Sequence, residues 1–195
     1  YLWSTGATSA SISGLSAGTY FVTVSDNCGK TKVDSAVISQ PQTLTTSVTQ
    51  TNVTCYLAGN GTATVTPSGG TTPFTYLWSN NATTNPVTGL CAGAYIVTVT
   101  DANNCTTTGT DTITQPTALS VSTSGNIIIC EGQTTIVSGS ATGGAGSFIF
   151  TWNTSETTSS IIVSPGTTTI YTVTVTDANN CTAQDSTTVT VNTTS

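Results

Sequence analysis

The chain has little charge, and it lacks the side chain that enzymes use most often as a base. Of its 195 residues only 5% are charged, two of them Lys and eight Asp or Glu, and neither His nor Met occurs. Ser and Thr hydroxyls therefore have no His to activate them, and the acidic residues are scattered singly rather than spaced as a catalytic pair. We expect that the chain is not an enzyme and that it uses no cofactor.

Other absences exclude further classes of protein. Two basic residues cannot form the basic patch that a nucleic-acid binder needs. No apolar run approaches 18 residues, so we expect no membrane span. None of the six cysteines forms a CxxC pair, and no His is present to complete a zinc site. The cysteines therefore predict disulfides and a location outside the cytoplasm.

The chain is rich in hydroxyl side chains, and it contains an internal repeat. It contains 49 Thr and 23 Ser, and Thr, Val, Ile and Tyr favour strands. Tyr1-Leu-Trp-Ser-Thr returns as Tyr76-Leu-Trp-Ser-Asn and, less closely, as Phe150-Thr-Trp-Asn-Thr, which gives a period of about 75 residues. Units of that size can bury a core of their own, so the repeat predicts domains in tandem.

The complete middle unit shows what each domain contains. Short alternating segments separated by turn residues are expected as strands at 44–54, 61–67, 74–79, 87–90, 95–100 and 106–114. Such a pattern without helical periodicity predicts an all-β fold of tandem immunoglobulin-like, PKD-like β-sandwich domains in a rod. Inward positions should hold Trp78, Tyr95, Val97 and Val99, and in the last unit Trp152, Tyr171, Val173 and Val175.

We expect three segments, and the first is incomplete. Residues 1–41 correspond to the C-terminal half of a repeat, 42–116 to a complete repeat and 117–195 to a further domain. The missing half of the first segment is expected either upstream in the same protein or in a neighbouring chain that donates strands. Gln40-Pro41 and Gln115-Pro116 join the segments without a flexible spacer, which favours a stiff rod.

The sequence resembles a known family at its most repetitive residues. The segments GGTTPFTYLWSNNATT and VTGLCAGAYIVTVTDANNC, within residues 1–116, resemble the SprB-type repeat of Bacteroidota surface proteins, named after the gliding adhesin. The last unit, with TTIYTVTVTDANNC, is more similar to the PKD-like, Ig-like domains that accompany those repeats. The resemblance implies very long extracellular chains, export by the type IX system, and roles in gliding motility, surface adhesion or filaments.

The cysteine spacing predicts bridges within each unit. Cys130–Cys181 would close 51 residues and Cys55–Cys105 would close 50. Cys91 is then left over. Related repeats often carry a further cysteine near the position of Gly59, so Cys55–Cys91 stays open as an alternative, and Cys28 is expected to pair with a residue that precedes the chain.

Three Asp residues each end a strand and start a turn, namely Asp26, Asp101 and Asp177. The simpler interpretation is an Asx-type turn, in which the carboxylate accepts hydrogen bonds from backbone N–H groups. The alternative is a Ca²⁺ ligand at a domain junction, but calcium needs six to eight oxygens and no second acid lies nearby in sequence. We therefore expect no metal site.

A second acidic motif occupies matching places in the three units. Asp34-Ser35-Ala36, Asp111-Thr112-Ile113 and Asp185-Ser186-Thr187 match the sequence at which Bacteroidota attach O-glycans, so Ser35, Thr112 and Ser186 are candidate glycosylation sites. The competing interpretation is an acid that protects an edge strand from pairing.

These observations predict a structural or adhesive segment of a long extracellular repeat protein on a bacterial cell surface, either a surface filament or the stalk of an adhesin. Its expected partners are neighbouring repeats of the same chain or filament, with surface polysaccharide as a further candidate. Two alternatives stay open: a glycan-binding module beside a secreted enzyme, which would need exposed aromatic side chains, and a polymer subunit completed by strand donation.

Overall fold

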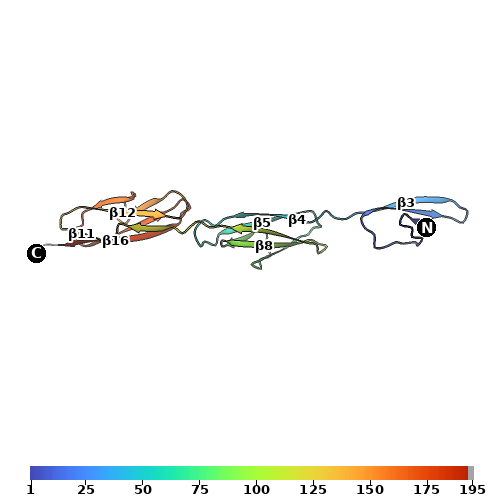
Figure 1. Cartoon of the computed structure of the whole chain (residues 1–195), viewed down its shortest axis with the longest axis horizontal. Coiled ribbons are helices and arrows are strands. Elements are labelled where there is room, and N and C mark those ends of the chain that lie inside the picture. Colours follow the sequence, from blue (N-terminus) through green and yellow to red (C-terminus); the bar gives the residue numbers. More distant parts are fainter. Residues whose placement is uncertain (193–195) are drawn as a thin grey trace.

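The computed structural model describes residues 1–192 and is built from β-strands throughout. Three bodies follow one another along the long axis of the molecule (Figure 1). The N-terminal sheet lies at one end, a central sandwich in the middle, and a C-terminal sandwich at the other end. Among the described residues there is no helix that is long and apolar enough to cross a membrane.

The N-terminal sheet is a single antiparallel layer. Its strands are β1 (Leu2–Trp3), β2 (Gly18–Ser25) and β3 (Thr31–Ile38), in the order β1-β2-β3. The loop from β1 to β2 contains no strand, so one face of this sheet has no second sheet against it.

The central sandwich has two three-stranded sheets in the orders β4-β5-β7 and β6-β8-β9. Its strands are β4 (Thr45–Thr51), β5 (Gly61–Ser68), β6 (Thr75–Trp78), β7 (Val87–Leu90), β8 (Gly93–Thr100) and β9 (Thr106–Ile113). All six coincide with the segments that alternation predicted to within a few residues, because each places one row of apolar side chains inward.

The C-terminal sandwich repeats this plan and adds one strand. Its sheets have the orders β10-β12-β14 and β11-β16-β15-β13. The added strand, β11, pairs in parallel with the end of β16. The strands are β10 (Ser120–Thr123), β11 (Ile127–Cys130), β12 (Thr135–Thr142), β13 (Ile149–Trp152), β14 (Ser160–Val163), β15 (Thr169–Thr176) and β16 (Thr182–Asn192).

The strand order identifies both sandwiches as immunoglobulin-like. In the central sandwich the first, second and fourth strands share one sheet, and the third, fifth and sixth share the other. The chain therefore crosses between the two sheets in the same way as the A, B, E and C, F, G strands of an immunoglobulin domain. The prediction of an all-β fold with tandem Ig-like domains is confirmed.

Each sandwich has its own core, at the positions that the repeat predicted. Trp78 is 1% exposed, and Val97 and Val99 are fully buried. Trp152, Tyr171, Val173 and Val175 are buried in the second core. Tyr95 is the exception, since it is only half-buried and its hydroxyl donates to the carbonyl of Cys91 at 3.2 Å. Because the two cores share no residue, each sandwich buries its apolar face separately.

The three tryptophans make one hydrogen bond that is repeated in every unit. The indole Nε1–H donates to the backbone carbonyl six residues further on, in Ser9, Thr84 and Thr158, at 2.9 to 3.0 Å. In the two sandwiches this bond satisfies the polar end of a large buried ring, whereas Trp3 is only half-buried. A buried and hydrogen-bonded Trp78 cannot offer its face to a sugar.

Candidate functional site

The feature of greatest functional interest is the junction between the central and C-terminal sandwiches, which begins with a tight turn. Asp177 directly follows β15, and its Oδ1 accepts hydrogen bonds from the backbone N–H groups of Asn179 and Cys181, each at 2.9 Å. Its Oδ2 accepts another from the N–H of Ala145 at 2.8 Å. One carboxylate thus shapes the turn that carries Cys181 and ties it to the β12–β13 loop.

The same construction recurs at the other end of the central sandwich, beside the linker from the N-terminal sheet. Asp101 accepts from the N–H groups of Asn103, Cys105 and Thr71 at 2.9, 2.8 and 3.0 Å. Burial alone would raise the pKa of both carboxyl groups, but the backbone donors outweigh it, so the pKa of Asp101 and that of Asp177 lie below their ordinary value. In the N-terminal sheet, Asp26 accepts from two N–H groups in a similar turn.

These bonds confirm the interpretation of the three Asp residues as turn-forming groups. Both oxygens of Asp101 and Asp177 face N–H donors, whereas a cation needs their lone pairs. Within the part of the chain that the structure describes, no three His, Cys, Asp or Glu side chains gather in a way that could hold a metal ion.

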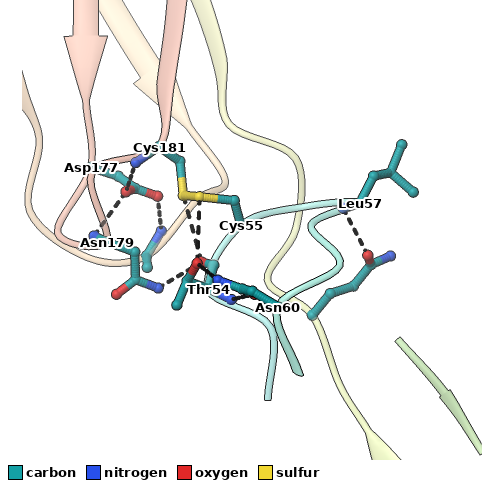
Figure 2. The surroundings of a disulfide bond; sticks show 9 residues. Thr54, Cys55, Leu57, Asn60, Asp177, Asn179 and Cys181 are labelled. Atoms are coloured by element: carbon teal, nitrogen blue, oxygen red, sulfur yellow. Dashed lines mark hydrogen bonds between the residues drawn. A yellow bond between two sulfur atoms is a disulfide. The ribbon is translucent and has the colours of Figure 1, made fainter. Parts of the chain in front are cut away.

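A disulfide crosses the junction. Cys55, in the loop after β4, is bonded to Cys181, in the turn before β16, with their Cα atoms 5.8 Å apart (Figure 2). The two residues are 126 positions apart in the sequence and belong to different sandwiches. The bridge therefore joins one unit to the next.

The predicted pairings within units are wrong, and the geometry of the last strand gives the reason. Cys181 precedes β16, whereas Cys130 pairs with Asn192 at the other end of that strand. Eleven residues of strand place the two cysteines roughly 33 Å apart. Cys55 and Cys105 are similarly separated along β9, and Cys28, Cys91, Cys105 and Cys130 are free and exposed within the described residues. The alternative Cys55–Cys91 is also wrong, although Gly59 is close to Cys91: a Cβ added to Gly59 would lie 3.6 Å from Cys91 Sγ.

Further contacts hold the loop that carries Cys55 against the turn (Figure 2). The Asn179 side-chain amide donates to the carbonyl of Thr54 at 2.8 Å. Cys181 Sγ also lies 3.5 Å from that carbonyl oxygen, but a disulfide sulfur carries no hydrogen, so this is a packing contact. Asn60 bonds across the base of this loop: its side chain accepts from the Thr54 N–H at 3.1 Å and donates to the Thr54 hydroxyl at 2.8 Å.

The linker between the sandwiches is fixed at both of its ends. The Gln115 side chain accepts from the N–H of Leu57 at 2.9 Å, which ties the linker to the Cys55 loop. Gly144 donates from its N–H to the carbonyl of Thr117 at 3.0 Å, and this holds the other end against the C-terminal sandwich. Gly144 has φ +61°, and a Cβ there would lie 2.7 Å from Asp177 Oδ2, so the close approach requires glycine.

The three candidate glycosylation residues are all exposed. Ser35, Thr112 and Ser186 lie on β3, β9 and β16. The preceding Asp34 and Asp111 each accept from the N–H of the candidate residue. Asp185 differs, because it reaches across to β10 and accepts from the N–H and hydroxyl of Thr123 at 2.8 and 2.9 Å. Hydrogen bonds from Ser186 and Thr123 lower the pKa of Asp185.

Comparison with known proteins gives a family match for the segment that contains Cys55. Residues 47–83 match the family model of the SprB repeat. The SprB match covers most of β4, the Cys55 loop, β5 and β6. It confirms the resemblance over these residues and, with the tandem architecture, supports a structural or adhesive repeat role. No curated protein matches the chain.

Among solved structures the chain is similar to Ig domains. It shares 11% identity and a TM-score of 0.46 with the N-terminal eight Ig domains of Down Syndrome Cell Adhesion Molecule isoform 1.30.30, over 90% of this chain and 27% of that one. It shares 11% identity and a TM-score of 0.39 with DIP-gamma IG1+IG2, over 78% and 98% of the two chains. The chain thus spans about a quarter of the first structure, and its Ig-like assignment rests on the strand order described above.

Proposed function

We propose that the chain is a segment of a non-catalytic, extracellular rod on a bacterial cell surface, serving as a surface filament or as the stalk of an adhesin. The observation that carries the proposal is the Cys55–Cys181 bridge, which joins successive units through a covalent bond. A disulfide fits an oxidising compartment outside the cytoplasm. Export by the type IX system and a part in gliding motility belong to this proposal through the SprB match.

The junction is suited to holding the two sandwiches in a fixed arrangement rather than to acting as a hinge. It combines the disulfide, the Asn179 hydrogen bond to Thr54 and the Gln115 hydrogen bond to Leu57. We take the units to be residues 1–41, 42–116 and 117–195, with neighbouring repeats as the main partners of each. A protein that only had to bind a ligand would not need a covalent bond between adjacent domains.

Small-angle scattering of the oxidised full chain tests the rod. At about 3.3 Å per residue of strand, the two complete units alone should extend over roughly 80 Å. The oxidised chain should give one narrow, elongated distribution of distances. A chain with Cys181→Ser should give a broader one, because only the hydrogen bonds of Asn179 and Gln115 and the linker contacts then hold the junction. A compact oxidised particle would contradict the proposal.

A binding assay separates the stalk from the sugar-binding alternative. The buried Trp78 and Trp152 leave no exposed tryptophan face in either sandwich, which favours the stalk. Titration with bacterial surface polysaccharide should therefore show no saturable binding to residues 1–195. Saturable binding would favour an adhesive or glycan-binding module instead.

We also propose O-linked glycans on Ser35, Thr112 and Ser186. Their exposure on strands near sheet edges makes them accessible, and sugar there would hydrate a surface with few charges and block pairing between edges. Intact-mass measurement of the native protein tests this proposal. A mass equal to that of the bare polypeptide with its disulfide would rule it out, and Asp34 and Asp111 would then serve as edge protection.

A further inference from the structure

The N-terminal sheet leaves open an apolar face whose counterpart in the central sandwich is buried. Val22 and Val24 occupy the positions of Val97 and Val99 in the repeat. Val99 is fully buried, whereas Val24 is 40% exposed. A groove of about 300 Å³ opens on this face, lined in part by Trp3, Ile12 and Leu15. In the central sandwich, β4, β5 and β7 cover the corresponding surface.

One strand position in this region also lacks its partner. Ile12-Ser-Gly-Leu15 matches Val87-Thr-Gly-Leu90, which forms β7, and Gly14 has φ +69° where Gly89 has +73°. β7 pairs with β5. Residues 12–15 form no strand, because the N-terminal sheet has no counterpart of β5 for them to pair with.

At the junction of the two sandwiches, the Cys55–Cys181 bond and the Asn179–Thr54 hydrogen bond form a clasp between a loop and a turn. The junction between the N-terminal sheet and the central sandwich has the turn of such a clasp. Cys105 stands in the turn that corresponds to Cys181, held by Asp101 as Cys181 is held by Asp177. Gly70 donates to the carbonyl of Gln42 at 2.8 Å, as Gly144 does to Thr117.

What differs is the neighbouring loop. Asn179 donates to Thr54 of the preceding unit, but its counterpart Asn103 turns back and donates to the hydroxyl of Thr71 in its own unit at 3.0 Å. The groove beside Cys105 measures about 250 Å³ and is lined in part by Pro41, Leu44 and Asp101. Its counterpart beside Cys181 measures about 430 Å³, and there Cys55 and Tyr56 of the preceding unit form part of the wall.

We propose that Asn103 and Cys105 form a clasp for the Thr–Cys loop of one further β-segment, whose strands also cover the open face of the N-terminal sheet. The occupant has the pattern of residues 42–75 and is joined ahead of Tyr1. One such segment meets both needs, because residues 42–75 supply both the strands that cover β8 and the loop that reaches the next unit.

Forming the bond is an oxidation. The Cys105 thiol and the occupant's thiol each lose a proton and an electron, and a disulfide oxidant such as oxidised glutathione takes up both electrons and both protons to become two thiols. The inference extends the proposed function but does not depend on it, because its test follows one bond and one strand pairing, not the shape or adhesion of the rod.

The test is a fusion that places a copy of residues 42–75 directly ahead of Tyr1 in the full chain. This restores the repeat register, since Tyr1 then follows Thr75 as Tyr76 does. The chain has four free cysteines, and the graft adds a fifth. After oxidation with oxidised glutathione, three thiols should remain free, and non-reducing peptide mapping should link the grafted copy of Cys55 to Cys105. Amide hydrogen exchange at residues 12–15 should slow at least tenfold.

Two matched variants separate docking from bonding. A fusion whose grafted cysteine is replaced by Ala, and a fusion with Cys105→Ala, should both protect residues 12–15 and form no new disulfide. A fused chain in which Cys105 stays free, in which the graft bonds to Cys28 or Cys91, or in which residues 12–15 exchange as fast as before would overturn the proposal. So would an oxidised unfused chain that dimerises through Cys105, because the occupant would then be a second copy.

Discussion

The two sandwiches differ in one segment, and the difference decides where a cysteine is placed. In the C-terminal sandwich the residues after β10 form β11, which pairs in parallel with the end of β16 and fixes Cys130 beside Asn192. In the central sandwich the matching segment leaves the sheet after one hydrogen bond, from the Val53 N–H to the carbonyl of Thr114 at 3.2 Å. It turns at Leu57, with φ +57°, and carries Cys55 toward the next unit.

The length of the last strand explains this difference. β16 has 11 residues, and its final residues, Val189–Asn192, give β11 a partner. β9 has eight residues and is soon followed by Pro116, which has no N–H to donate to a ladder. A unit that is followed at once by a Gln-Pro linker therefore has its cysteine loop free to reach its neighbour.

Removing a core tryptophan should have the largest effect and tests whether the sandwiches are independent. Trp78→Ala and Trp152→Ala should each lower the free energy of unfolding of their own sandwich by about 3–5 kcal/mol. The separate cores predict that each change leaves the other sandwich intact. Hydrogen exchange followed by mass spectrometry resolves the two. Equal loss of protection in both sandwiches from either variant would show that they unfold as one unit.

Breaking the bridge should have the next largest effect. Cys181→Ser frees Cys55 and restores conformational entropy to the unfolded chain, so the free energy of unfolding should fall by about 2–4 kcal/mol. Cys130→Ser is the matched control, since Cys130 is exposed and free, and it should change stability by less than about 0.5 kcal/mol. Urea denaturation of the oxidised variants measures both. If Cys130→Ser costs as much as Cys181→Ser, the assignment of the bridge is wrong.

The paired glycines should distinguish the two sandwiches more finely. Gly70 and Gly144 both have positive φ, and an added Cβ would lie 3.1 Å from Asp101 Oδ2 in the first case and 2.7 Å from Asp177 Oδ2 in the second. Either Gly→Ala change should cost about 1–3 kcal/mol. We expect Gly144→Ala to cost more because its contact is shorter. Thermal unfolding of the two variants ranks them, and a lower cost for Gly144→Ala would contradict this ranking.

Acid should produce the smallest change, and its sign follows from the turn carboxylates. The folded-state pKa values of Asp101 and Asp177 lie below the ordinary 3.8, so the unfolded chain binds more protons near that pH. Their stabilising contribution is present above about pH 5 and is lost as pH falls through 3.8 toward the folded pKa. Urea titrations of the wild type and of Asp177→Asn should differ by a constant amount from pH 7 to 5 and converge below. If the difference in unfolding free energy between the two proteins grew as the pH fell, the predicted sign of the pH dependence would be wrong.

The strands and cores could be predicted from the sequence because each depends on neighbours within a few residues. Alternation around Val97 and Val173 fixes which face is buried, and the tryptophans repeat at the same register. Asp101 and Asp177 were also predictable as turn formers, because an Asx turn is local.

The bridge could not be predicted, because it depends on which end of a strand each cysteine occupies. The similar spans of Cys55–Cys105 and Cys130–Cys181 only reflect the repeat period, and they are equally consistent with a bond to the next unit. The partial burial of Tyr95 was missed for a similar reason. A hydroxyl that reaches the carbonyl of Cys91 keeps the ring near the rim of the core, and alternation alone does not show this.

The covalent link across the junction also determines how the molecule responds to tension. A pull on the two ends of the chain passes from Cys55 directly to Cys181, so the segment between these two residues, which are 126 positions apart, carries no end-to-end load. At roughly 3.4 Å per residue, about 430 Å of contour is withheld from extension until the bond is reduced. The withheld segment contains β5 to β15, which is most of both sandwiches. A surface fibre built from such units would yield under shear at its sheet edges and termini while its domains stay folded, and its extensibility would depend on the redox state of its surroundings.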